Sequence, residues 1–96
     1  INRVLETHYS DETLDVAFLA SEMAMSPRQL ARKMRSLVDF TPAESIRSFR
    51  LKKAVALLDQ GMLPGVVAHQ VGFTSHSYFS RCFKAQYDCM PSSFRS

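Results

Sequence analysis

The chain has 96 residues, of which 46% are hydrophobic, and its formal net charge is +3. The apolar content is enough for real cores and so disfavours a disordered chain; the length suits one small domain, or two very small lobes that share a connecting element. There is no apolar run of about 18 residues and no signal-peptide pattern, so we expect a cytoplasmic chain without a membrane segment. The chain begins at Ile1, and we therefore expect a domain of a longer protein.

Apolar residues recur at helical spacing throughout, and no segment alternates with a period of two. The pattern predicts an all-α fold of seven helices. The first two helices are expected near residues 2–9 and 16–23, with a polar break at residues 10–12 between them. The apolar residues Met23, Met25 and Met34 are expected to fill the core.

Two helix starts are strongly marked. Ser26-Pro27 followed by Gln29, and Thr41-Pro42 followed by Glu44, both have the composition of a capping box with proline at the first helical position. The second start opens a long helix that should end near residue 58 or 59, before Gly61.

The long helix is apolar on more than one side, so it is predicted to connect two lobes and to belong to both cores. We place the first lobe at residues 1–40, the linking helix at 41–60 and the second lobe at 61–96. A single ordinary helical bundle is the alternative. Within the second lobe, helices are expected near residues 64–70 and 75–87 and from Pro91. The aromatic residues expected in the core are Phe73, Phe79, Phe83 and Phe94.

The charges are unevenly distributed. Residues 1–25 have a net charge of −4, residues 26–53 of +6 and the remainder of +1. A local basic field of this kind suits a polyanionic partner, although a solvated helix face would also explain it.

Two helical patterns, one in each half of the chain, repeat each other. The helix that starts at Ser26 has an inner face of Leu30, Met34 and Leu37, and the helix near 75–87 has one of Phe79 and Phe83. The outward positions of the two helices correspond at an offset of 49 residues. Pairs at this offset are Ser26/Ser75, Arg28/Ser77, Arg32/Arg81 and Arg35/Lys84. Upstream, Ala20/Ala68 and Met23/Val71 differ by 48, so the second turn is one residue longer. Each copy reads as a helix-turn-helix, whose second helix enters the major groove of DNA.

The residue types on the outward faces suit this chemistry. Arginine can donate two hydrogen bonds to guanine, which gives roughly 1–3 kcal/mol of discrimination. Small residues allow a helix to approach closely, and serines at helix starts can anchor phosphates. The alternative for all these side chains is a plain solvated surface. The expected base-reading residues are Arg28, Ala31, Arg32, Arg35, His76, Ser77, Ser80 and Arg81, and the expected backbone contacts are Ser26, Lys33, Ser75 and Lys84.

The chain shows no signature of a metal, cofactor or catalytic site. Cys82 and Cys89 do not make a disulfide framework, and the three histidines have no zinc-ligand spacing. Paired carboxylates, a nucleophile with its base and a phosphate-binding glycine loop are not recognisable either. We therefore expect no enzyme, no cofactor and no metal.

The sequence resembles the AraC/XylS family of bacterial transcription regulators over essentially the whole chain. The first half matches in Met25-Ser26-x-x-x-Leu30-x-Arg32-Lys33 and Thr41-Pro42-x-Glu44-x-Ile46-Arg47-x-x-Arg50-Leu51-x-x-Ala54. The second half matches in Gly72-Phe73-x-Ser75-x-Ser77-Tyr78-Phe79-Ser80-Arg81-x-Phe83-Lys84 and Pro91-x-x-Phe94-Arg95. The first half is also similar to the domains that end two-component response regulators and hybrid sensor kinases.

The resemblance implies two helix-turn-helix lobes that read successive major-groove segments of double-stranded DNA and regulate transcription. This chain is then expected to be a monomer, with dimerisation left to the full-length protein and RNA polymerase as a further partner. The alternative function is a helical interaction module that docks on RNA polymerase or another regulator. Two positions depart from the family pattern: Asp88 replaces a glycine, and Pro64-Gly65 opens the fifth helix.

Overall fold

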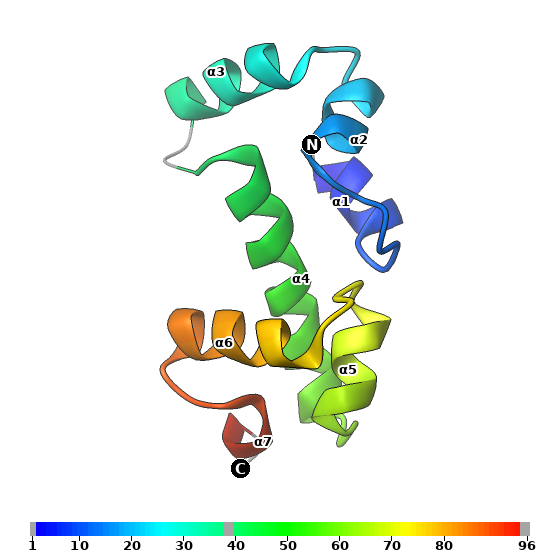
Figure 1. Ribbon diagram of the computed structural model, residues 1–96, viewed down its shortest axis with the longest axis vertical. Coiled ribbons are helices and arrows are strands. Elements are labelled where there is room, and N and C mark those ends of the chain that lie inside the picture. Colours follow the sequence, from blue (N-terminus) through cyan, green and yellow to red (C-terminus); the bar gives the residue numbers. More distant parts are fainter. Residues whose placement is uncertain (1, 38–39, 95–96) are drawn as a thin grey trace.

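The computed structural model describes residues 2–37 and 40–94, so Asp39 and the Arg95 of the closing motif lie outside the described residues. The described residues form seven helices and no strands, which confirms the all-α prediction (Figure 1). They are α1 (Asn2–His8), α2 (Val16–Glu22), α3 (Pro27–Leu37), α4 (Pro42–Asp59), α5 (Pro64–Gln70), α6 (His76–Tyr87) and α7 (Pro91–Phe94). None of these helices is long and apolar enough to cross a membrane.

Local capping explains why the helix starts could be predicted. The Ser26 Oγ accepts from the Gln29 N–H at 3.2 Å, and the Gln29 Oε1 accepts from the Ser26 N–H at 2.9 Å. Thr41 and Glu44 form the same reciprocal pair at 3.1 and 2.9 Å. Both capping boxes are therefore present, and they fix where α3 and α4 begin.

Helix α4 is the shared element of the fold. It packs against α2 and α3 at one end and against α5 and α6 at the other (Figure 1). Its residue Ile46 is buried in one core, whereas Leu51, Ala54 and Leu58 are buried in a second one. The Cα trace measures 40 × 23 × 20 Å, so the molecule is elongated, with α4 joining its two ends.

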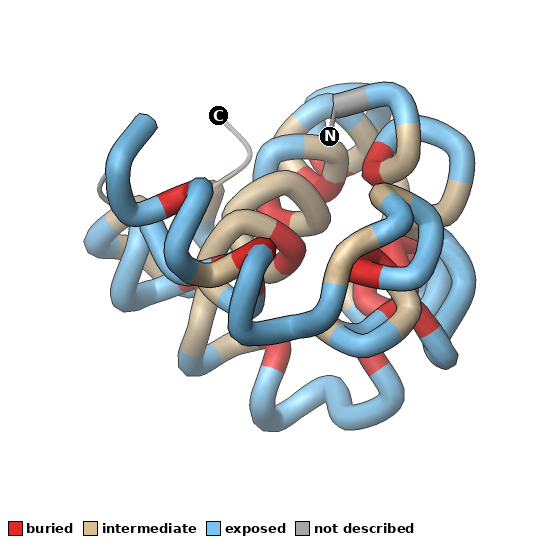
Figure 2. Tube along the Cα trace, turned by 90° about the horizontal axis from the view of Figure 1, so that it is seen from above, coloured by how far each residue is buried: buried red, intermediate tan, exposed pale blue. Residues whose placement is uncertain are grey.

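The two cores are built from different parts of the chain, and buried residues lie on the inner sides of the helices (Figure 2). The first contains Leu5, Leu14, Leu19, Ala20, Leu30, Met34 and Ile46. The second contains Leu51, Ala54, Leu58, Val67, Ala68, Val71, Phe73, Phe79 and Phe83. Phe94 was expected in the core but is only half-buried, and it packs against the edge of the second core with its ring edge-on to Phe83.

The turns of the two helix-turn-helix units have matching backbones. Ala24 has φ 57° and Gly72 has φ 90°, and each directly follows the C-cap residue of its helix, Met23 or Val71. The next amide, of Met25 or Phe73, donates to the carbonyl of Ala20 or Ala68, at 2.9 Å in both cases. The repeat inferred from the sequence thus extends to the turn conformation.

The end of α6 adopts the geometry that glycine favours, although the residue is an aspartate. Asp88 has φ 61° and caps the helix, and its N–H donates to the Lys84 carbonyl at 2.8 Å. Aspartate tolerates this left-handed conformation better than most residues.

Candidate nucleic-acid interface

Helix α3 presents a cationic face opposite its buried side. Leu30 and Met34 are 2% and 7% exposed, which anchors the helix to the first core. The expectation that Leu37 shares this inner face is wrong, because Leu37 is the last residue of α3 and is 71% exposed. Arg28, Arg32 and Arg35 are all exposed on the other side. The spacing of three or four residues places these arginines on one face, as the helical period requires.

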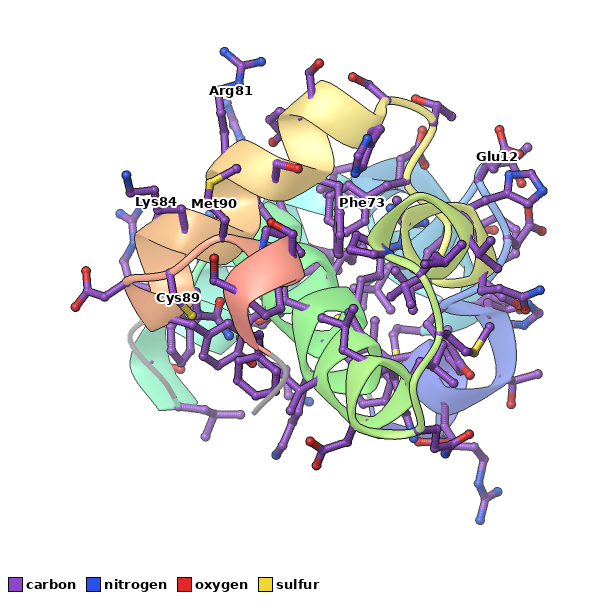
Figure 3. All side chains as sticks on the ribbon, turned by 90° about the horizontal axis from the view of Figure 1, so that it is seen from below. Glu12, Phe73, Arg81, Lys84, Cys89 and Met90 are labelled. Carbon is purple, nitrogen blue, oxygen red and sulfur yellow. The ribbon has the colours of Figure 1, made fainter. Side chains whose placement is uncertain are left out.

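Helix α6 repeats this division. Phe79 and Phe83 are fully buried, whereas Ser77, Arg81 and Lys84 are exposed. In Figure 3, Arg81 and Lys84 extend from α6 away from the body of the molecule. Two further predicted readers lie on this helix: His76 is exposed at its first position, and Ser80 is half-buried.

The capping serines place a hydroxyl at the start of each of these helices. The Ser75 Oγ accepts from the Tyr78 N–H at 3.2 Å, as the Ser26 Oγ does from Gln29 in the first lobe. Since the hydroxyl oxygen is the acceptor in both caps, its hydrogen is left to donate outward. Lys33, the other predicted backbone contact of the first lobe, is exposed.

A shallow hollow of about 650 Å³ runs along the exposed face of α6. It is lined by His76, Ser77, Ser80, Arg81, Lys84, Ala85 and Met90. It therefore gathers the second-lobe residues that the sequence singled out, except Ser75. Met90 was missed because it lies beyond the helix, where helical spacing gives no signal. Its side chain is 40% exposed and flanks α6 (Figure 3).

Arg81 has an aromatic neighbour, Tyr78, to which the sequence pattern assigned no role in the site. Its guanidinium carbon lies 5.8 Å from the centre of the Tyr78 ring, within the range of a cation–π contact. Tyr78 in turn packs against Phe73, with ring centres 5.9 Å apart. At an exposed site such a contact contributes about 0.5–1 kcal/mol, which favours the Arg81 rotamer that lies over Tyr78. Tyr78 was part of the motif, and its spacing of three from Arg81 was the available signal.

A smaller hollow lies beside the second half of α3. Ala31 and Arg35 line a space of about 190 Å³ together with Phe40 and Thr41. Phe40 is 52% exposed. Ala31 therefore faces a recess beside the connection to α4, whereas Arg28 and Arg32 do not line it.

Arg47 of α4 is half-buried beside the cationic face of α6. It lines a groove of about 470 Å³ that it shares with Tyr78 and Arg81. It also lines a second hollow of about 260 Å³ that reaches Thr74. Its place in the site was not predicted, because Arg47 lies on α4 and has no counterpart in the repeat of α3 and α6.

Fewer cations of the basic segment (residues 26–53) are exposed and unpaired in the fold than the sequence suggests. Lys53 forms an ion pair with Glu6 at 2.7 Å, and Arg50 is half-buried. By contrast, the ion pairs found among the described residues include none of the cations of α3 or α6. The cations of α3 and α6 therefore stay unpaired within the described residues, as does the exposed Lys52 of α4.

Comparisons with known proteins agree with this arrangement. The sequence model of a family described as "Helix-turn-helix domain" matches residues 19–96. Histidine kinase P4 of Formosa agariphila is 33% identical over 95 residues, which are 98% of this chain and 7% of that protein. The arabinose operon regulatory protein of Escherichia coli is 31% identical over 102 residues, which are 99% of this chain and 35% of that protein. The chain thus spans about a third or less of these relatives.

A solved structure extends the likeness to a complex with DNA. The DNA-binding domain of AdpA, described as a global transcriptional factor in complex with a target DNA, matches with a TM-score of 0.88. The two are 29% identical, and the match covers 98% of this chain and 84% of that one.

Proposed function

This chain belongs to the AraC/XylS family of helix-turn-helix domains, and from this premise we propose that it binds double-stranded DNA sequence-specifically to regulate transcription. Helices α3 and α6 are its recognition helices, each entering one of two successive major-groove segments. The domain acts by binding, with no catalytic step and no cofactor of its own. A bacterial, cytoplasmic setting goes with this proposal.

One observation carries the proposal: the exposed cations of α3 and α6 occupy equivalent positions on two equally built helices. Arg32 and Arg81 are both exposed, while the residues two before each, Leu30 and Phe79, are buried. The two helices lie across opposite ends of α4, which has 18 residues and is therefore about 27 Å long (Figure 1). Successive major-groove segments on one face of DNA are about 34 Å apart. Two recognition helices at the ends of a helix about 27 Å long are therefore separated by a distance of the right size to reach both segments.

The residue assignments within the two helices belong to the same proposal. The base-reading residues are Arg28, Ala31, Arg32, Arg35, His76, Ser77, Ser80 and Arg81. Ser26, Lys33, Ser75 and Lys84 contact the DNA backbone, where charge and hydroxyl groups position the helices without reading sequence. Residues 1–40 and 61–96 form the two lobes, and 41–60 the linking helix.

A single chain presents both recognition helices, so we propose that this domain binds as a monomer. Dimerisation and contact with RNA polymerase belong to the longer protein. The rival function is a helical module that docks on RNA polymerase or another regulator through a solvated basic surface. It is less favoured, because it gives no reason for two equivalent cationic faces at the two ends of α4.

Selection from random duplex DNA tests the proposal directly. Two short motifs centred about ten base pairs apart are expected, one for each recognition helix. Binding to the selected duplex should weaken steeply as salt rises, because several phosphates are neutralised. Recovery of one motif would leave one lobe as a specific reader, and no enrichment at all would favour the interaction module.

A further inference from the structure

Arg50, near the middle of α4, holds three carbonyl groups of the first lobe. Its Nε donates to the Tyr9 oxygen at 3.0 Å, and one Nη donates to the oxygens of Asp11 at 2.8 Å and Leu14 at 3.3 Å. These three acceptors lie in the connection between α1, which ends at His8, and α2, which begins at Val16. The planar fork of arginine allows one side chain to serve several acceptors of this connection.

This guanidinium is held by carbonyl groups rather than by a carboxylate. The ion pairs among the described residues do not include Arg50. Burial lowers the pKa of the Arg50 guanidinium, and the nearby charge of Asp11 acts in the opposite direction. A half-buried cation of this kind needs its acceptors in place, so the side chain and the connection of the first lobe stabilise each other.

The second lobe packs against the same guanidinium through Gly72. A Cβ atom on Gly72 would lie 2.5 Å from the Tyr9 oxygen, 3.0 Å from the Arg50 Nε and 3.2 Å from its Cζ. The turn between α5 and α6 therefore touches both partners of one hydrogen bond. Ala24, at the equivalent position of the first lobe, is exposed and carries a methyl group. The absence of a side chain at position 72 thus serves the contact between the lobes as well as the turn.

Two further contacts join the lobes around this point. The side chain of Tyr9, at the end of the first lobe's α1, packs against the second core. His69 of α5 lies 4.0 Å from Glu12 of the first lobe, measured from Nδ1 to Oε1. The lobes therefore meet directly, in addition to sharing α4, and Arg50 lies where the connection of one and the turn of the other converge.

We infer that Arg50 is a positioning residue that locks the two lobes in one relative orientation and so sets the half-site spacing that both recognition helices can read. The inference rests on the proposed function. Shifting one half-site by a base pair moves it by about 3.4 Å and rotates it by about 35°. A locked pair of lobes cannot follow such a shift, whereas lobes joined by α4 alone can adjust by bending.

The first measurement uses the whole 96-residue chain and a series of duplexes. They carry the selected half-sites at their natural spacing and at spacings one or two base pairs shorter or longer. For the wild type, a change of two base pairs should weaken binding at least tenfold. Arg50→Met should bind the natural spacing about tenfold more weakly and lose less than about threefold further at any other spacing. Duplexes with one half-site should bind both proteins within about twofold.

Lys52→Met is the matched control. Lys52 is exposed on the same helix, and the substitution removes the same charge. Its spacing profile should keep the wild-type shape. A folded Arg50→Met protein whose profile coincides with that of the wild type would overturn the inference.

The second measurement needs no DNA, and it separates this inference from the proposed function. Residual dipolar couplings of the wild-type chain should fit one alignment tensor for both lobes, whereas Arg50→Met should require two. One tensor for both lobes of Arg50→Met overturns the inference, even if the wild type reads no DNA sequence. Selection without any enriched motif would overturn the proposed function and leave the lock itself intact.

If Arg50→Met does not fold, Arg50→Lys takes its place in both measurements. A lysine ammonium lacks the fork that reaches three carbonyls, so a flatter spacing profile and two tensors are still expected, with smaller changes. A folded Arg50→Lys protein with the wild-type profile and one tensor would equally contradict the inference.

Discussion

Ala24 and Gly72 occupy the same backbone position in the two helix-turn-helix units, both with positive φ, but only Gly72 is covered by the other lobe. The difference distinguishes two physical reasons for which a position can require glycine. A left-handed backbone disfavours any side chain, by roughly 1–2 kcal/mol for alanine. Close packing adds a second cost wherever a neighbour occupies the place of the Cβ.

We therefore predict opposite effects of exchanging the two residues. Ala24→Gly should stabilise the chain by about 0.5–1 kcal/mol, because relief of the left-handed strain exceeds the entropy that glycine adds to the unfolded chain. Gly72→Ala should destabilise it by at least about 2 kcal/mol, because strain and the contact with the Tyr9 carbonyl add together. Urea denaturation of both variants measures this. Effects of equal size and opposite sign would mean that the packing against Tyr9 contributes nothing.

Removing either central arginine should weaken binding without affecting the fold. Arg32→Ala and Arg81→Ala are each expected to cost roughly 1–3 kcal/mol on the selected duplex and to relax the preference at different base pairs. Binding titrations on single-base variants of the duplex check both effects. Arg3→Ala, an exposed arginine of α1 away from both recognition helices, is the control and should bind as the wild type does. Folded Arg32→Ala and Arg81→Ala proteins with undiminished binding would rule out the assignment of α3 and α6.

Lys84 should act on affinity alone. If it neutralises a phosphate, Lys84→Gln lowers the slope of log K against log salt by about 1 and weakens all duplexes to a similar degree. The measurement is a salt titration on the selected and on an unrelated duplex, with Lys52→Gln as the control. A loss confined to the selected duplex would instead assign base reading to Lys84.

The capping box of α4 should make stability depend on pH. Hydrogen bonds from the Thr41 backbone and side chain lower the pKa of the Glu44 carboxyl from its ordinary value of 4.5. Because the folded pKa is lowered, this stabilisation is complete above about pH 4.5 and is lost as the pH falls through the lowered value. Glu44→Gln can still accept the hydrogen bond but does not titrate. Its Tm should therefore fall less than that of the wild type between pH 6 and pH 2.5.

Hydrogen bonds from Thr13 also lower the pKa of the Asp11 carboxyl. Because Asp11 is present in the wild type and in Glu44→Gln, its effect on Tm is the same in both and cancels in the comparison. Parallel curves of Tm against pH would show that Glu44 makes no charge-dependent contribution to the cap.

The helices could be predicted closely because their signals are local. Ser26 and Thr41 cap through residues three positions away, and Gly61, with φ 92°, follows α4 as expected. The outward faces of α3 and α6 were equally accessible, since residues at helical spacing share a face whatever surrounds them. The roles of these residues toward DNA remain predictions.

Contacts between distant segments could not be predicted in this way. Arg50 stands in a basic stretch and reads as a surface charge, yet its acceptors lie about 40 residues earlier in the chain. Leu51 is 1% exposed but was not named as a core residue, because it is surrounded by cations in the sequence. Met90 lies outside any helix. In each case the deciding information is which segments meet, and one sequence does not contain it as a local pattern.

The length of α4 has a consequence for how such domains can change. One residue inserted between Ile46 and Leu51 would rotate everything beyond it by about 100° and advance it by about 1.5 Å. The second recognition helix would then point away from the duplex, and the Arg50 contacts would be broken. Inserting a whole turn would restore this direction but would still move Arg50 and Gly72 about 5.4 Å away from Tyr9. The length of α4 should therefore stay fixed, and longer operators should be met by additional protomers rather than by longer linkers.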